Sequence, residues 1–159
     1  MSGKTERDWK TERVDGRDLG LDEVLEVYRS SGLGERRPAG DRERMATMVR
    51  EANLVVVARD ADGALIGIAR SLSDFSYVTY LSDLAVVHGH QRSGVGLALL
   101  EATRRQAPDA KIVLLSAPAA SGYYPRIGFT RHDSAWVLNP GQPLTASRTA
   151  AEEDAVTHP

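Results

Sequence analysis

The spacing of hydrophobic positions changes after Asn53, and the change separates predicted helices from predicted strands. Before it, apolar side chains recur every three or four residues over residues 21–28 and 42–51, the spacing of helices that bury one face. Asp41 stands where an aspartate can cap the second helix. Repeated glycines and prolines at residues 32–40 predict a loop between the two helices.

Short apolar runs rich in β-branched residues predict strands in the rest of the chain. The predicted strands are 9–14 at the N-terminal edge, then 54–58, 65–72, 77–87, 111–115 and 129–138. Asp62-Gly63 favours a tight hairpin turn, and the short connection after it predicts a further antiparallel strand. A helix at residues 97–106 precedes strand 111–115, so a parallel, right-handed crossover is expected there. Residues 122–126 predict a short helical element.

This order of elements predicts an α/β (α+β) domain, with a mixed, mostly antiparallel central sheet flanked by helices. The domain is expected to span residues 9–139, between a flexible N-terminus at 1–8 and a loose C-terminal tail at 140–159. The apolar residues 135–138 end the last predicted strand and could join a second copy of the chain. The sequence is therefore compatible with a homodimer.

The composition narrows the classes of function. A chain of 159 residues with 42% hydrophobic and 26% charged residues suits one globular domain. The net charge of −2 gives no reason to expect nucleic acid as a partner. The lack of cysteine excludes disulfides and thiolate catalysis and fits a cytoplasmic protein. No apolar run has the length of a membrane span, so no membrane partner is expected.

A glycine-spaced loop between the strand 77–87 and the following helix is suited to binding phosphate groups. Gly94 and Gly96 let the backbone approach a ligand, and the free N–H groups of the first helical turn point toward negative charge. A P-loop needs a Lys-Ser/Thr pair after its last glycine, and a dinucleotide fingerprint needs a third glycine. This chain has neither feature, so the loop is predicted to be an anion site of another kind.

Two motifs together resemble the GNAT N-acetyltransferase superfamily. Gln91, Gly94 and Gly96 fit the Gln/Arg-x-x-Gly-x-Gly pattern of its pyrophosphate loop. Residues 123–129 look like its aromatic-Tyr-x-x-x-Gly-Phe segment, and the motifs with the element order cover nearly all of residues 9–138. The resemblance implies an acyltransferase that uses acetyl-CoA as co-substrate, needs no metal, and moves an acetyl group to a primary amine by direct attack on the thioester.

The resemblance also assigns binding residues. Those implied to contact coenzyme A are Leu84, Ala85 and Val86 along the pantetheine, and Gln91, Arg92, Ser93, Gly94, Val95, Gly96 and Leu97 around the pyrophosphate. One position departs from the family pattern. Many members carry an asparagine seven residues before the tyrosine, where this chain has Ala117. Ser121 or backbone groups are expected to replace it.

Tyr124 and Asp83 are the candidate catalytic residues. Tyr124 matches the family's tyrosine general acid, which would protonate the leaving thiolate; the alternative is aromatic packing beside Phe129. Asp83 lies in an apolar strand, where a carboxylate is costly unless it is bonded or functional. It could take the amine proton or bind the substrate ammonium, or be a structural carboxylate that accepts backbone N–H groups. His88 and His90 are further candidates for the base, but exposed loop histidines are the simpler explanation.

The acceptor is expected to be a small-molecule amine. Asp74, Tyr77 and Tyr80 could form an acidic, aromatic pocket for it, although they also suit an ordinary strand and loop. No acidic run offers a site for a basic protein tail, which favours the small molecule over a protein or peptide. A non-catalytic acyl-CoA sensor is the alternative of another class. Arg36-Arg37 could attract an anionic group or simply be solvated.

Overall fold

The computed structural model describes residues 7–145, and the chain divides into two compact units, residues 1–122 and 123–159. Most of the predicted flexible N-terminus and the end of the predicted tail lie outside the described residues. Within these residues, no helix combines the length and the apolar character needed to cross a bilayer.

The first unit is built on one five-stranded sheet with the order β1-β2-β3-β4-β5. The strands are β1 Trp9–Val14, β2 Leu54–Asp60, β3 Leu65–Ser73, β4 Val78–Val86 and β5 Lys111–Val113. The first four pair antiparallel and β5 pairs parallel to β4, as the intervening helix predicted. The mixed, mostly antiparallel sheet of the prediction is thus confirmed.

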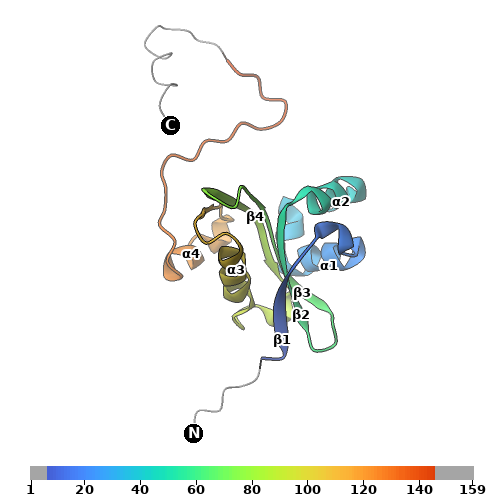
Figure 1. Ribbon diagram of the computed structural model, residues 1–159. Helices are drawn as coiled ribbons and strands as arrows, with labels where there is room; N and C mark the ends of the chain where they lie inside the picture. The colour runs from blue at the N-terminus through green and yellow to red at the C-terminus, as the bar shows by residue number, and fades with distance from the viewer. Residues whose placement is uncertain (1–6, 146–159) are drawn as a thin grey trace. The chain divides into compact units, whose positions relative to one another are not determined.

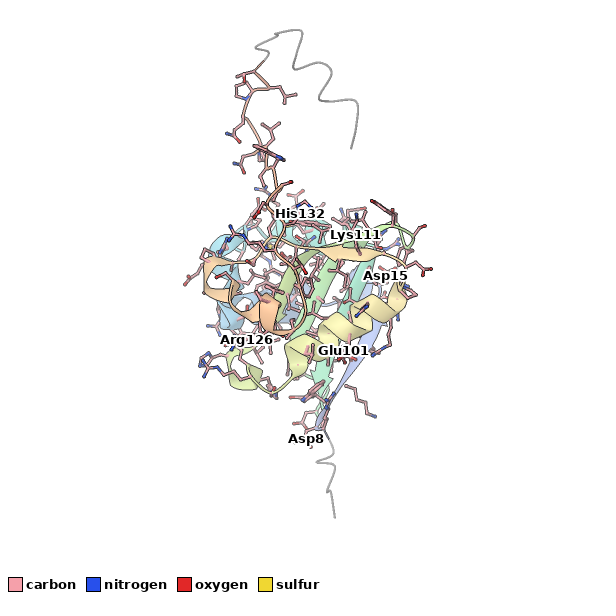
Figure 2. All side chains as sticks on the ribbon, turned by 90° about the vertical axis from the view of Figure 1, so that its left-hand side faces the viewer. Asp8, Asp15, Glu101, Lys111, Arg126 and His132 are labelled. Atoms are coloured by element: carbon pink, nitrogen blue, oxygen red, sulfur yellow. The ribbon has the colours of Figure 1, made fainter. Side chains whose placement is uncertain are left out.

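Helices cover both faces of this sheet. Helices α1 (Leu21–Ser31) and α2 (Arg42–Glu51) lie on one face, and α3 (Val95–Gln106) lies on the other (Figure 1). In Figure 2, α3 lies in front of the strands and carries the exposed Glu101. The predicted cap of α2 is confirmed, because Asp41 Oδ1 accepts the Arg44 N–H at 3.1 Å.

Short 3-10 helices occur in the connections. They are η1 Gly16–Asp18, η2 Leu33–Arg36, η3 His88–His90 and η4 Pro118–Ala120. The loop predicted at residues 32–40 therefore contains one helical turn, η2. α3 begins two residues earlier than predicted, because Gly94 adopts a left-handed φ of 87° and serves as its N-cap.

The main core lies between the sheet and helices α1 and α2. Val24, Val27 and Tyr28 of α1 and Met45 and Val49 of α2 are buried there. They pack with buried strand residues of the same face, namely Val55, Val57, Leu65, Ile68 and Ala85. Their removal from water is the main stabilising contribution to this unit.

Gly67 allows close packing on the opposite face. A Cβ added at Gly67 would lie 3.0 Å from Leu99 Cδ1 and 3.1 Å from Val95 Cγ1. Both contacts are tighter than most Cβ atoms make, so any larger residue would require Val95 and Leu99 at the start of α3 to shift. Gly67 pairs with Val86, the last residue of β4, and so the helix N-terminus is held beside the end of β4.

The second unit contains helix α4 (Tyr123–Arg126). The Tyr124 ring meets the rings of Tyr123 and Phe129 edge to face, each with a centroid separation of 5.3 Å. Backbone N–H groups of Ile127 and Phe129 both donate to the Tyr124 carbonyl, which closes the turn after the helix.

The strand predicted at residues 129–138 is absent from the structure, so this prediction was wrong. The chain turns near Asp133, and the Ser134 N–H donates to His132 Nδ1 at 3.2 Å. Only four of the ten residues are large and apolar, and Trp136 is 91% exposed. With no buried face, the segment lacks the packing that stabilises a strand. Residues 135–138, where a contact with a second copy was predicted, thus form no strand.

Candidate functional site

β4 separates from β5 halfway along its length. The two strands pair only from Val78 to Tyr80, opposite Lys111 to Val113. From Leu81 to Val86, β4 has no strand partner on that side among the described residues. On its other side, the pairing with β3 shifts between Leu81 and Asp83, so Ser82 is the extra residue of a bulge. We call residues 81–86 the free edge of β4.

The predicted anion cradle lies directly after this free edge. Arg92 and Gly94 have left-handed φ values of 63° and 87°, a geometry that turns successive backbone N–H groups into a concave surface. The first helical hydrogen bond of α3 runs from the Ala98 N–H to the Gly94 carbonyl, so the N–H groups of the first turn have no acceptor within the helix.

The backbone at Gly94 is not crowded by other atoms. A Cβ added at Gly94 would meet no atom within 4 Å, so the space above the backbone is open. Residues 91–94 and Leu97 are exposed. The Gln91 side chain is bonded within the protein, because its Nε2 donates to the Val86 carbonyl at 3.0 Å. This bond ties the loop to the end of β4 and so links the two halves predicted to bind coenzyme A.

Two further polar residues of the predicted site, Ser93 and Ser121, have local partners. Ser93 Oγ donates to the His90 carbonyl, which closes the turn before the cradle. Ser121 Oγ donates to the Pro118 carbonyl at 2.9 Å, within η4 and its C-cap. The His88 N–H donates to Ser30 Oγ at 3.0 Å, which ties the same turn to α1. His88 is exposed, as expected for a loop histidine.

Asp83 is buried at the centre of a polar cluster. Its side chain is 0% exposed. Oδ2 accepts from Tyr28 Oη at 2.5 Å and from Arg70 Nε at 2.6 Å. Oδ1 accepts from Arg37 Nε at 2.6 Å. Two guanidinium groups and one phenol therefore surround a single carboxylate.

This environment keeps Asp83 ionised. Burial alone would raise the pKa of the carboxyl, but the hydrogen bonds and charge of Arg70, with the bonds from Tyr28 and Arg37, hold its pKa below the ordinary value. The pKa of Tyr28 is raised, first by burial and then by the neighbouring carboxylate, so the phenol stays protonated. Asp83 could take a proton only by giving up an ion pair. The geometry therefore favours a structural carboxylate, whose donors are side chains rather than backbone N–H groups.

The sequence interpretation missed the partners of Asp83. The predicted strand 65–72 contains Arg70 but indicates no role for it, and the sequence indicates only anion binding or solvation for Arg37. A signal did exist: Arg70 and Asp83 are opposite charges in the two arms of one predicted hairpin, where cross-strand pairing is expected. Arg37 had no such signal, because it reaches β4 from a loop 46 residues away.

The structure keeps Asp74 and Tyr77 together in one turn and places Tyr80 apart from them. Asp74 Oδ1 accepts the backbone N–H groups of residues 76, 77 and 78, so it organises the β3–β4 hairpin turn, and these bonds lower its pKa. Tyr77 Oη accepts from Lys111 Nζ at 2.9 Å at the same end of the sheet. Tyr80 is farther along β4, directly opposite Leu72.

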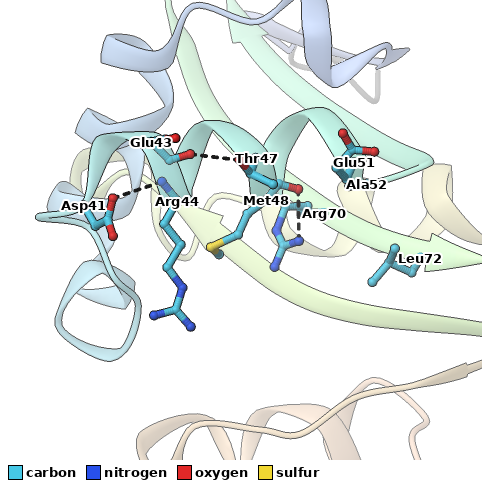
Figure 3. Close-up of a pocket in the computed structure, with 9 residues that line it drawn as sticks. All are labelled: Asp41, Glu43, Arg44, Thr47, Met48, Glu51, Ala52, Arg70 and Leu72. Atoms are coloured by element: carbon cyan, nitrogen blue, oxygen red, sulfur yellow. Dashed lines mark hydrogen bonds between the residues drawn. The ribbon is translucent and has the colours of Figure 1, made fainter. Parts of the chain in front are cut away.

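A groove of about 530 Å³ lies between α2 and β3. Figure 3 shows Arg70 Nη1 donating to the Met48 carbonyl, with Arg44 extending from α2 and Leu72 farther along the strand. Its remaining lining residues are Asp41, Glu43, Thr47, Glu51 and Ala52. Because Tyr80 pairs with Leu72, it lies next to the groove on the same face of the sheet. Arg70 connects this groove with the buried Asp83.

Tyr124 has the protonation state that an acid requires. Burial, followed by the nearby Tyr123, raises the pKa of its phenol above the ordinary value. The hydroxyl is therefore protonated at neutral pH. The edge-to-face contact with Phe129 also makes it a packing residue, so the two interpretations of Tyr124 are compatible in this structure.

Comparison with known proteins identifies the family of this chain. The family model for the acetyltransferase (GNAT) domain matches residues 24–140. The matched residues include the strands β4 and β5, which separate, and the glycine-capped helix α3. The fold and this site therefore define an acetyltransferase. The chain is a member of the GNAT acetyltransferase family. No curated protein matches the chain with significance.

Solved structures share the fold at low sequence identity. A GNAT-family protein from Streptococcus pneumoniae is 19% identical, with a TM-score of 0.64, over 82% of this chain and 98% of that one. An aminoglycoside acetyltransferase from an uncultured soil metagenomic sample is 20% identical, with a TM-score of 0.61, over 83% and 95%. A Trypanosoma brucei acetyltransferase is 21% identical, with a TM-score of 0.57, over 83% and 99%. At these identities the likeness establishes the fold alone.

Proposed function

We propose that the protein transfers an acetyl group from acetyl-CoA to a primary amine of a small molecule. The observation that carries this is the continuity of the free edge of β4 with the cradle at Gly94. An extended donor ending in a pyrophosphate would find backbone hydrogen-bonding groups along the edge and an anion site at its end. The Gln91–Val86 bond fixes the two parts relative to each other.

This geometry supports the proposed coenzyme-A contacts of the strand and the cradle. Backbone groups of Leu84, Ala85 and Val86 would bond the pantetheine arm, and the N–H groups from Arg92 to Leu97 would hold the pyrophosphate. The bound thioester supplies an activated acetyl group. A backbone N–H of the free edge would donate to the carbonyl oxygen as negative charge develops there.

The reaction balances with one proton donor in the protein. An amide bond forms at the amine nitrogen and the thioester carbon–sulfur bond breaks. We assign the proton taken up by the sulfur to the Tyr124 hydroxyl, whose raised pKa keeps it protonated until that moment. The amine loses its proton to water, because the Asp83 carboxylate is saturated by Arg70, Arg37 and Tyr28. The tyrosinate left at Tyr124 regains a proton from water.

The groove beside α2 is the proposed acceptor site. Its volume falls within the range of small-ligand pockets, roughly 300–1,000 Å³. Met48 and Leu72 offer apolar contact. The three carboxylates of the lining (Asp41, Glu43 and Glu51) outnumber its two guanidinium groups (Arg44 and Arg70), which favours a cationic amine. One solved relative of the fold is an aminoglycoside acetyltransferase bound to sisomicin, which supports a small-molecule acceptor.

The test is an amine panel with purified protein and acetyl-CoA, with free thiol followed over time. Release of thiol with a small-molecule amine, and none with basic peptides, is the expected result. Release only with peptides would assign a protein or peptide acetyltransferase. Thermal stabilisation by coenzyme A without any thiol release would indicate a non-catalytic acyl-CoA sensor. Absence of coenzyme-A binding would contradict the whole proposal.

A further inference from the structure

Arg37 connects the loop between α1 and α2 with the bulge of β4. Its Nε donates to Asp83 Oδ1 at 2.6 Å, and its Nη2 donates to the Ser82 carbonyl at 2.9 Å. We propose that Arg37 is a positioning residue for acetyl transfer, which holds the bulge and thereby sets the course of the free edge of β4. This inference rests on the proposed function, because the free edge is where the acyl donor would lie.

The bulge needs an external donor. The extra residue of a β-bulge is left out of the ladder of backbone hydrogen bonds. The Ser82 carbonyl is bonded by Arg37, and Ser82 Oγ accepts from Arg70 Nη2 at 2.7 Å. Two arginines thus hold the side chain and the carbonyl of the same residue. The conformation of the bulge is therefore determined by side chains from outside β4.

The guanidinium shape is essential to this role. Two of its nitrogens, Nε and Nη2, reach two different acceptors at once, and the fork is rigid and planar. A lysine offers a single nitrogen and would keep the charge while losing one of the two contacts. A lysine at position 37 thus distinguishes the geometry of the residue from its charge.

Arg37 is itself held in place. Its backbone N–H donates to the Gly34 carbonyl at 3.4 Å, and its Nη1 donates to the Arg36 carbonyl at 2.8 Å. Its side chain is 24% exposed, so solvent screens these bonds less than those of a surface ion pair. Arg36, the neighbouring residue, is exposed and provides a matched control.

Loss of Arg37 leaves a balanced core behind. Asp83 would keep Arg70 and Tyr28 as partners, which is one carboxylate for one guanidinium. The variant Arg37→Gln is therefore expected to fold, in contrast to variants of Asp83. Positioning and folding can consequently be measured apart.

The experiment compares Arg37→Gln, Arg37→Lys and Arg36→Gln with the wild-type protein. Amide hydrogen exchange in residues 81–86 should quicken in Arg37→Gln on the order of tenfold, because a charge-assisted bond to the bulge is lost. We expect kcat for acetyl transfer to fall on the order of 10- to 100-fold with little change in the KM for acetyl-CoA, because misplacement affects the reacting geometry. Arg37→Lys should recover part of kcat, and Arg36→Gln should match the wild type.

Several results would overturn the inference. Exchange and kcat of Arg37→Gln equal to those of Arg36→Gln would show that Arg37 does not hold the bulge. Faster exchange with unchanged kcat would show that the bulge does not matter for transfer. If Arg37→Gln fails to fold, Arg37→Lys decides the question. Full activity of Arg37→Lys would show that simultaneous bonds to Asp83 and Ser82 are not needed, and a reduced kcat would support the need for them. A wild-type protein that neither binds coenzyme A nor transfers acetyl groups would overturn the proposed function. Hydrogen exchange in residues 81–86 would still test whether Arg37 stabilises the bulge.

Discussion

Arg70 and Asp83 face each other directly across the β3–β4 pair, and Arg70 Nε lies 2.6 Å from Asp83 Oδ2. The pair sits between the groove, which Arg70 lines, and the bulge at Ser82, which Arg70 also bonds. A single cross-strand ion pair thus links the proposed acceptor side to the proposed donor side. The predictions below test this arrangement and the cradle.

Gly94→Asp should raise the dissociation constant of acetyl-CoA by at least about tenfold. The substitution places a negative charge where the pyrophosphate would lie and forces a side chain onto a φ of 87°. Isothermal titration calorimetry measures the change. Gly63→Asp is the control, because Gly63 has a φ of 81° in the open β2–β3 turn and shares the backbone strain without the site. Equal affinities of the two variants would place the ligand elsewhere.

Tyr124→Phe should lower kcat by on the order of 100-fold while the KM for acetyl-CoA changes little, because a positioned proton donor acts in the transition state. Steady-state thiol release measures both constants. Tyr123→Phe, one residue away, should stay near wild type. An unchanged kcat, with chemistry shown to limit turnover, would leave Tyr124 with its packing role against Phe129 alone.

Asp83→Asn should destabilise the fold by about 3–5 kcal/mol, because two guanidinium groups would lose their buried counter-ion. Urea unfolding followed by circular dichroism measures the free energy. A general base would give a different result, namely a folded protein of near-normal stability with low kcat. Glu23→Gln is a suitable comparison, since its partner Arg59 lies in a more exposed pair and the cost should be about 1 kcal/mol or less.

The cluster around Asp83 should make stability fall at both ends of the pH scale. The pKa of Asp83 is lower in the folded state, so its contribution is present above the unfolded pKa, about 3.9, and is lost as pH falls through the folded pKa. The pKa of Tyr28 is raised on folding, so its contribution is present below about pH 10 and is lost as pH rises beyond it toward the folded pKa. Urea unfolding across pH should show both slopes, and Tyr28→Phe should flatten the alkaline one.

Gly67→Ala should destabilise the protein by about 1–3 kcal/mol and weaken acetyl-CoA binding, since the new methyl group would press on Val95 and Leu99 and displace the start of α3. Thermal unfolding and calorimetric titration measure the two effects. Gly40→Ala serves as the control, because a Cβ there meets no atom within 4 Å. A fully stable Gly67→Ala protein with normal affinity would mean that α3 tolerates the shift.

Local patterns in the sequence determined most of the secondary structure and the cradle. The periodicity of 42–51, the capping position of Asp41 and the glycine at 94 each act within one element, so their consequences follow from neighbouring residues alone. The strand predicted at 129–138 failed because strand formation depends on pairing and burial, which no local pattern guarantees.

Only the tertiary structure determined the partners of Asp83. Its partners Tyr28, Arg37 and Arg70 lie 55, 46 and 13 residues away along the chain. The sequence indicated that a carboxylate in an apolar strand must be bonded or functional, because an unpaired buried charge is costly. Which groups satisfy it depends on how the sheet, α1 and the loop before α2 pack together, and that is a property of the folded chain rather than of any segment.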